Sequence, residues 1–197
     1  MQLNRRLILA SKSPRRIGLL KQIGLNAEII PSSVEEQFEA ATSPAENAAR
    51  LALLKAQDVG VSIDEGIVIG ADTIVALDGR MLGKPVDEAD ACRMLELLSG
   101  RTHAVYTGLT LIDRPSNRVV TEVEATHVTF RQLPQEEIRA YVASGSPLDK
   151  AGAYGIQDDY GAVFVTRIEG CFYNVMGFPL AKFYTMLRQF QSQLTTQ

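Results

Sequence analysis

Short apolar runs alternate with helix-start signatures in the early part of the chain, and this alternation constrains the fold more than any other feature. Two helices are expected to start at Ser13 and Ser43, each a capping serine followed by a proline at the first helical position. They run to about Ile23 and Val59. Strands connected through helices lie parallel in one sheet. The apolar runs, each short enough for a buried strand, are Leu7–Ala10, Ala27–Ile30 and Ile67–Ile69.

Longer β-rich stretches follow, and turns rather than helices connect them. Asp78-Gly79 is a typical two-residue hairpin turn between Ile74–Leu77 and Arg80–Leu82. A second turn joins Thr102–Ile112 to Arg118–Phe130. Further elements expected are helices over Asp87–Leu98, Pro134–Ala143 and Leu180–Leu194 and a strand over Ala162–Ile168. The sequence therefore predicts an α/β fold with a mixed sheet flanked by helices.

Composition excludes several classes of function. No linker divides the 197 residues, so one domain over residues 1–197 is expected. The formal net charge of -3 gives no general attraction to nucleic acid or to an anionic membrane. No apolar run approaches the roughly 20 residues that a transmembrane helix needs. With only 2 cysteines and no signal-peptide pattern, we expect a cytoplasmic protein.

A cluster of cations marks the start of the first helix. The window Ser11–Arg16 carries three positive charges, and Arg15 and Arg16 fall in the first helical turn, where the helix dipole disfavours cations. A bound phosphate would reverse that effect, because backbone N–H groups, serine hydroxyls and guanidinium groups all bind it. A solvated cationic turn explains the same residues. If the arginines serve an anion, removal of Arg16 should leave the ligand-free stability unchanged or higher.

Asp72 follows a buried strand, where a carboxylate needs a partner. The predicted hairpin sets Thr73 opposite Lys84, which places Lys84 diagonal to Asp72. The two side chains reach one site only if the strand bends near a glycine. A structural ion pair and a general base or metal ligand for attack on phosphate both agree with this spacing.

Further candidates lie in a loop, a helix and a glycine-rich segment. Glu35 and Glu36 are either solvated or able to bind a divalent ion. Lys55 lies in an apolar stretch and either extends along the surface or reaches a cleft. The segment Asp149–Gln157 forms either a tight turn or a close backbone approach to a ligand. No His or Cys motif of zinc-binding spacing occurs in the sequence, so a structural zinc is not expected.

Several motifs, in order along the chain, resemble those of the Maf family of nucleoside triphosphate pyrophosphatases. The resemblance extends from about Leu7 to Leu187. Each motif alone is weak, but the ordered set is specific. The matching segments are Leu9-Ala-Ser-Lys-Ser-Pro-Arg-Arg16, Gly70-Ala-Asp-Thr73, Gly83-Lys-Pro85, Ser99-Gly-Arg-Thr-His103 and Asp149-Lys-Ala-Gly-Ala-Tyr-Gly-Ile-Gln157.

The resemblance implies an elongated fold with two lobes around a central cleft, similar to that of the inosine triphosphate pyrophosphatases. It implies hydrolysis of a nucleoside triphosphate to a monophosphate and pyrophosphate with a divalent cation, Mg²⁺ or Mn²⁺, and it leaves a homodimer possible. Asp72 matches the catalytic carboxylate of the family, and Glu36 matches its loop glutamate, the two being the expected metal ligands. The residues that match phosphate contacts are Ser11, Arg15, Arg16, Lys55 and Lys84.

The family divides by substrate, and Arg15, Thr73 and Gln157 resemble the branch that acts on dTTP, UTP and their modified forms. A branch that acts on 7-methyl-GTP differs at the positions of Thr73 and Gln157. Two other functions stay open: a nucleotide-binding regulator that inhibits septum formation, and a phosphomonoesterase. A pure binder has no need of a carboxylate near a triphosphate. The sequence departs from the family pattern at Lys12 and at Asp158-Asp159-Tyr160.

Overall fold

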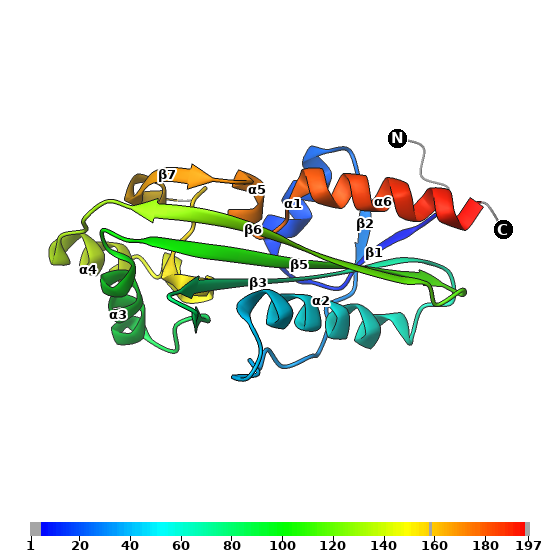
Figure 1. Cartoon of the computed structure of the whole chain (residues 1–197), viewed down its shortest axis with the longest axis horizontal. Coiled ribbons are helices and arrows are strands. Elements are labelled where there is room, and N and C mark those ends of the chain that lie inside the picture. The colour runs from blue at the N-terminus through cyan, green and yellow to red at the C-terminus, as the bar shows by residue number, and fades with distance from the viewer. Residues whose placement is uncertain (1–4, 158, 196–197) are drawn as a thin grey trace.

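One mixed sheet carries the fold, and helices cover both of its faces (Figure 1). The computed structural model describes residues 5–157 and 159–195, so Asp158 lies outside the described residues. The strands are β1 (Leu7–Leu9), β2 (Ala27–Ile29), β3 (Gly66–Leu77), β4 (Arg80–Leu82), β5 (Thr102–Arg114), β6 (Val119–Phe130) and β7 (Val165–Glu169). The α-helices are α1 (Pro14–Gln22), α2 (Pro44–Gly60), α3 (Glu88–Leu98), α4 (Gln135–Ala143), α5 (Phe172–Val175) and α6 (Leu180–Thr195). Short 3₁₀ helices span Ser146–Asp149, Ala151–Ala153 and Asp159–Phe164.

The strand order is β2-β1-β3-β5-β6-β7, and β4 also pairs with β3. β1 lies parallel to β2 and β3, whereas the pairings of β3 with β4 and β5, of β5 with β6 and of β6 with β7 are antiparallel. The predicted hairpin register is confirmed from Leu77–Arg80 to Val75–Leu82, but β4 ends there, so the ladder does not extend to the predicted pair Thr73–Lys84. The predicted mixed α/β sheet is therefore confirmed. Within the described ranges, no helix has the length and apolar character needed to cross a membrane.

The two largest apolar clusters lie toward opposite ends of the elongated sheet, which confirms the expected two lobes (Figure 1). In one lobe, α3 and α4 bury Leu95 and Ile138 against the sheet. In the other, α1 and α6 bury Leu19 and Phe183. The long strands β3 and β5 contribute residues to both cores, so the lobes share one sheet.

Two sequence-based expectations about strand ends are wrong. Residues 66–77 form the single strand β3, with Asp72 inside it rather than after it. A polar residue after an apolar run suggested a strand end because an isolated carboxylate is costly inside a sheet. In the fold, Lys55 provides the missing partner. The strand expected from Ala162 begins at Val165, because a 3₁₀ helix occupies the residues before it.

One edge of β3 changes partners along its length. β1 pairs with β3 up to Ile69, and β4 pairs with it from Val75 onward. Among the described residues, no strand pairs with this edge of β3 between those two points. The chain leaving β1 continues into α1, and the chain leaving β4 continues toward α3. The gap therefore lies where two neighbouring strands both end, a typical place for a ligand site in an open sheet.

The backbone of α2 lies unusually close to the sheet. Gly70 on β3 and Gly108 on β5 permit this approach, because a side chain at either position would meet the helix. A Cβ atom at Gly70 would lie 2.1 Å from the carbonyl oxygen of Ala52, and one at Gly108 would lie 2.2 Å from that of Ala48. No other residue type fits unless the helix moves. The close approach brings Lys55, less than one turn beyond Ala52, over β3.

We expect Gly70→Ala to lower the free energy of unfolding by roughly 1–3 kcal/mol or more, because the new methyl group forces α2 away from the sheet. The control is Gly18→Ala in α1, where a Cβ atom meets nothing within 4 Å. That change should raise stability by up to about 1 kcal/mol, because alanine favours a helix. Urea unfolding midpoints of both variants measure the difference, and equal midpoints would contradict the close contact.

Candidate active site

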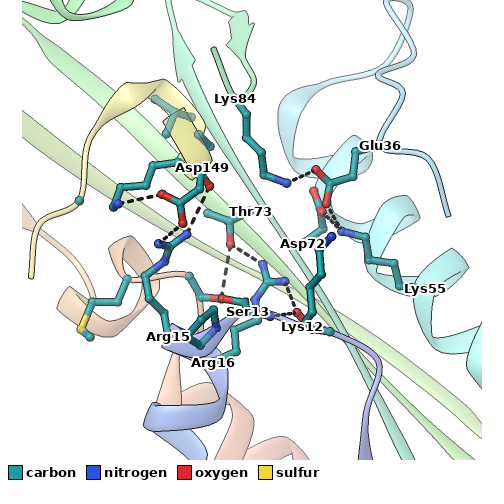
Figure 2. A pocket seen from close by; sticks show the side chains of 18 of the residues that line it. Lys12, Ser13, Arg15, Arg16, Glu36, Lys55, Asp72, Thr73, Lys84 and Asp149 are labelled. Carbon is teal, nitrogen blue, oxygen red and sulfur yellow. Dashed lines mark hydrogen bonds and ion pairs between the residues drawn. The ribbon is translucent and has the colours of Figure 1, made fainter. Parts of the chain in front are cut away.

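A cavity of about 880 Å³ opens at the gap in the edge of β3, within the usual size of small-molecule sites. Side chains from α1, α2, β3 and the adjoining loops converge on it (Figure 2). Nine candidate residues from the sequence line this cavity, whereas Glu35, the alternative to Glu36, does not. The nine are Ser11, Arg15, Arg16, Glu36, Lys55, Asp72, Thr73, Lys84 and Gln157. The structure therefore brings these nine together, although they span most of the chain.

Two lysines and two carboxylates form an ion-pair cluster on one wall (Figure 2). Lys55 Nζ lies 2.5 Å from Asp72 Oδ1 and 2.6 Å from Glu36 Oε1. Lys84 Nζ lies 2.7 Å from Glu36 Oε2. Asp72 thus pairs with Lys55, not with Lys84 as the hairpin register suggested, because α2 crosses the same face of β3 from which Asp72 projects.

Burial acts on the two carboxylates differently. Asp72 is only 4% exposed, and burial raises the pKa of its carboxyl group although Lys55 and Arg16 oppose the shift. Glu36 lies on a loop and is partly exposed. Burial also tends to raise its pKa, but Lys55 and Lys84 outweigh that effect and lower the pKa of Glu36 to about 2. Glu36 therefore stays ionised, whereas Asp72 binds a proton more readily.

Arg16 is buried, and it holds three segments together. Its Nε donates to the carbonyl oxygen of Gly177 at 2.9 Å, its Nη1 to Ser11 Oγ at 3.3 Å and its Nη2 to Thr73 Oγ1 at 3.1 Å. Burial lowers the pKa of Arg16, and the carboxylates of Asp72 and Glu36 oppose that effect. The sequence led to the expectation that removal of Arg16 leaves the ligand-free stability unchanged or higher. These three contacts favour the opposite outcome, a loss of stability.

Arg15 extends to the opposite wall of the cavity (Figure 2). Its Nη1 donates to Asp149 Oδ2 at 3.0 Å. Asp149 Oδ1 also accepts a hydrogen bond from Lys150 Nζ at 2.8 Å, and Lys150 Nζ donates to the carbonyl oxygen of Ser146 at 2.5 Å. The ion pair between Arg15 and Asp149 thus connects α1 to the glycine-rich segment across the cavity.

The start of α1 faces the cavity, and the side chain of its capping residue does not occupy the backbone N–H groups there. Ser13 is the capping residue and Pro14 follows it, as predicted, but the Ser13 side chain makes no cap hydrogen bond. The Ser13 N–H instead donates to Ser11 Oγ at 3.2 Å. Residues 10–16 all line the cavity. This helix end is therefore positioned to bind an anion.

The remaining wall is largely apolar and is formed by Val75, Val105, Tyr154, Val175 and Met176. Tyr154 Oη lies 2.8 Å from His103 Nε2. Burial raises the pKa of Tyr154 and lowers that of His103 to about 4, so both are neutral near pH 7. An apolar wall beside a cationic wall suits a ligand with a flat ring and an anionic tail.

Sequence reasoning missed three contributors to the site. Lys150 and Tyr154 belong to the glycine-rich segment that the sequence singled out, but neither was assigned a role. The available signal for Lys150, which is buried, was its position next to Asp149. Gly177 accepts a hydrogen bond from Arg16 through its backbone carbonyl, and a backbone contact of this kind cannot be recognised from the residue type.

Comparison with known proteins agrees with this geometry. The family model described as "Maf-like protein" matches residues 6–190. The chain belongs to the Maf family. The chain is 51% identical over 184 residues to the dTTP/UTP pyrophosphatase of Carboxydothermus hydrogenoformans, covering 93% of this chain and 98% of that protein. It is 50% identical over 191 residues to the dTTP/UTP pyrophosphatases of Bacillus cereus and Bacillus anthracis, covering 97% of this chain and 98% of each.

The two arginines of this Maf protein should differ in their effect on ligand-free stability. Arg16→Ala should lower the free energy of unfolding by roughly 1–3 kcal/mol, because buried acceptors lose their donor. Arg15→Ala should cost less than about 1 kcal/mol, because its ion pair with Asp149 is partly exposed. Urea midpoints without nucleotide measure both. If Arg15→Ala were the more destabilising change, the assignment of Arg16 as the internal brace would be wrong.

Proposed function

We propose that this Maf protein is a nucleoside triphosphate pyrophosphatase that hydrolyses dTTP, UTP and related modified pyrimidine triphosphates, with a role in nucleotide-pool housekeeping. The products are a nucleoside monophosphate and pyrophosphate. The observation that carries the proposal is one cavity in which a buried carboxylate, Asp72, lies beside a cluster of cations. The family membership and the names of the relatives support the same function.

The cations of the cavity suit a triphosphate. Lys55 and Lys84 approach from one wall, and Arg15 and the start of α1 approach from the other. In the ligand-free protein, Glu36 and Asp149 neutralise part of this charge. A triphosphate would take over those ion pairs, and the same cations would stabilise the charge that moves onto the departing pyrophosphate.

We assign Asp72 as the general base. Burial raises its pKa, which makes the carboxylate a better proton acceptor, and its position beside Lys55 places it against bound phosphate. Asp72 takes a proton from a water molecule as the water oxygen bonds to the α-phosphorus. The bond from that phosphorus to the oxygen shared with the β-phosphorus breaks at the same time, and pyrophosphate leaves with the bonding electron pair.

Glu36 and Asp72 fit a divalent cation. Both carboxylates contact the same Lys55 ammonium group, so a single small cation could lie within reach of both. Mg²⁺ is commonly held by one or two carboxylates together with substrate phosphates. Over residues 5–157 and 159–195, no group of three or more His, Cys, Asp or Glu side chains is placed to hold a metal ion. Mg²⁺ or Mn²⁺ bound there with substrate would neutralise phosphate charge.

Gln157 is the residue proposed to recognise the nucleobase. Its side chain lines the cavity that also contains the apolar wall. A primary amide offers an acceptor and two donors, and the edge of uracil or thymine offers acceptor, donor and acceptor, so the two can form paired hydrogen bonds. Cytosine reverses two of these positions. Thr73 supports this reading because its small side chain leaves space beside Arg15 for a ring.

Replacing the proposed base should remove most of the activity and leave the fold intact. We expect Asp72→Asn to lower kcat for dTTP by about 10²–10⁴-fold, the usual contribution of a general base. Circular dichroism checks the fold, and Asp64→Asn, a surface change outside the cavity, is the acid-to-amide control. Turnover of folded Asp72→Asn at the rate of the control would remove Asp72 from the mechanism.

A panel of nucleoside triphosphates tests the substrate class. We expect release of pyrophosphate from dTTP and UTP, with CTP, ATP and GTP slower by about one to two decades, because a mismatched buried amide loses its hydrogen bonds. Gln157→Glu should narrow that preference without loss of the fold. Orthophosphate as the product would indicate a phosphomonoesterase, binding without any product would indicate a regulator, and a purine preference would contradict the assignment of the base.

A further inference from the structure

A buried hydrogen-bond chain runs from Arg16 into the sheet, behind the wall of the cavity. Arg16 Nη2 donates to Thr73 Oγ1, and Thr73 Oγ1 lies 2.9 Å from Thr107 Oγ1 on the neighbouring strand β5. Thr107 Oγ1 in turn donates to the carbonyl oxygen of Asn174 at 3.3 Å. Thr107 has an exposed fraction of 0%, and it is not among the residues that line the cavity.

The same series of hydrogen bonds closes into a ring through Gly177. The Gly177 N–H donates to the Asn174 carbonyl oxygen at 2.9 Å. The Gly177 carbonyl oxygen accepts hydrogen bonds from Arg16 Nε at 2.9 Å and from Thr73 Oγ1 at 3.4 Å. Asn174 is anchored separately, because its Nδ2 donates to the carbonyl oxygen of Val105 at 2.9 Å. The turn that receives Arg16 is therefore held at a fixed distance from the sheet.

Thr107 determines which groups donate and which accept in this ring of hydrogen bonds. Each threonine hydroxyl has one proton, and Thr73 Oγ1 already accepts from Arg16. Thr73 can give its proton to Thr107 while Thr107 donates to Asn174, or it can accept from Thr107 and donate to Gly177. In both arrangements, Thr107 fixes the Thr73 hydroxyl with a lone pair toward Arg16. Without Thr107, the Thr73 hydroxyl loses its 2.9 Å partner, and of these contacts it keeps only those with Arg16 and, at 3.4 Å, with the Gly177 carbonyl oxygen, so its direction toward Arg16 is less constrained.

We propose that Thr107 is a positioning residue of the active site that sets the direction of the Arg16 guanidinium group through Thr73 and Gly177. The proposal rests on the proposed pyrophosphatase function. Thr107 touches no substrate, because it is fully buried behind Thr73. Its effect reaches the triphosphate through Arg16, which braces Ser11, Thr73 and Gly177 and also lines the cavity.

Thr107→Val tests the proposal, because it keeps the shape of the side chain and removes the hydroxyl. We expect the KM for dTTP to rise about tenfold, as for one lost hydrogen bond to a charged group, with kcat changed much less. Thr107→Ser restores the hydroxyl and should return KM to within about twofold of wild type. If Thr107→Val does not fold, Thr107→Ala serves for the same comparison.

Thr110→Val is the matched control. Thr110 lies on the same strand and is equally buried, and its Oγ1 lies 2.9 Å from Thr121 Oγ1, a contact that does not lead to Arg16. We expect this variant to lose a comparable amount of stability and to keep the wild-type KM. Equal KM values for Thr107→Val and Thr110→Val would overturn the proposal, as would a Thr107→Ser variant with the KM of Thr107→Val.

A second measurement does not depend on activity. In the ligand-free protein, NMR exchange of the Arg16 Nε–H with water should be slow in wild type and in Thr110→Val, and about tenfold faster in Thr107→Val. Equal exchange in the two valine variants would overturn the positioning role. If wild type releases no pyrophosphate from dTTP, the proposed function fails, and the exchange experiment alone decides the role of Thr107.

Discussion

The direct contact between the backbone of α2 and the sheet at Gly70 and Gly108 is the constraint on which the site depends. It places Lys55 over the centre of β3, where Asp72 projects from the same face. Neither charge would be stable alone at that depth, and each neutralises the other. A wider separation between helix and sheet would leave a buried carboxylate without a partner. The glycines are thus as important to the chemistry as the charged residues.

The location of the site follows from the ends of two strands. β1 stops at Leu9, and the chain passes into the cationic window Ser11–Arg16. β4 stops at Leu82, and Lys84 follows within two residues. Both ends meet the same open edge of β3, so two unrelated segments deliver positive charge to one place. Glu36 lies between the two lysines and limits their repulsion.

Local features of the fold could be predicted from sequence because they depend on neighbouring residues. The starts of α1 and α2 after Ser13 and Ser43 and the hairpin at Asp78-Gly79 are examples, and the structure confirms their positions, although only Ser43 caps its helix with its side chain. The partner of Asp72 could not be predicted, since it depends on where a distant helix crosses the sheet. The structural role of Arg16 inside the protein could not be predicted either, because its acceptor is the backbone carbonyl of Gly177.

The sequence predicted which residues form the candidate site, but not which of them contact one another. Family resemblance named residues from a loop, two helices and two strand regions, and all of them line one cavity. Spacing alone could not reveal that Lys55 is shared between two carboxylates or that Thr73 is engaged inside the protein. Such pairings form only when elements far apart in sequence pack together. Side-chain identity constrains them weakly.

The two lobes share β3 and β5, and this sharing determines how the cavity can change shape. A hinge requires a few backbone positions that rotate between two rigid bodies. Here the long strands pass through both lobes with their ladders intact, so rotation of one lobe against the other would break many inter-strand hydrogen bonds. Entry and exit of a ligand must therefore rely on irregular segments. Glu36 lies on such a segment and Asp149 ends a short 3₁₀ helix, and their ion pairs with Lys84 and Arg15 tie these parts of the chain to the cations of the cavity.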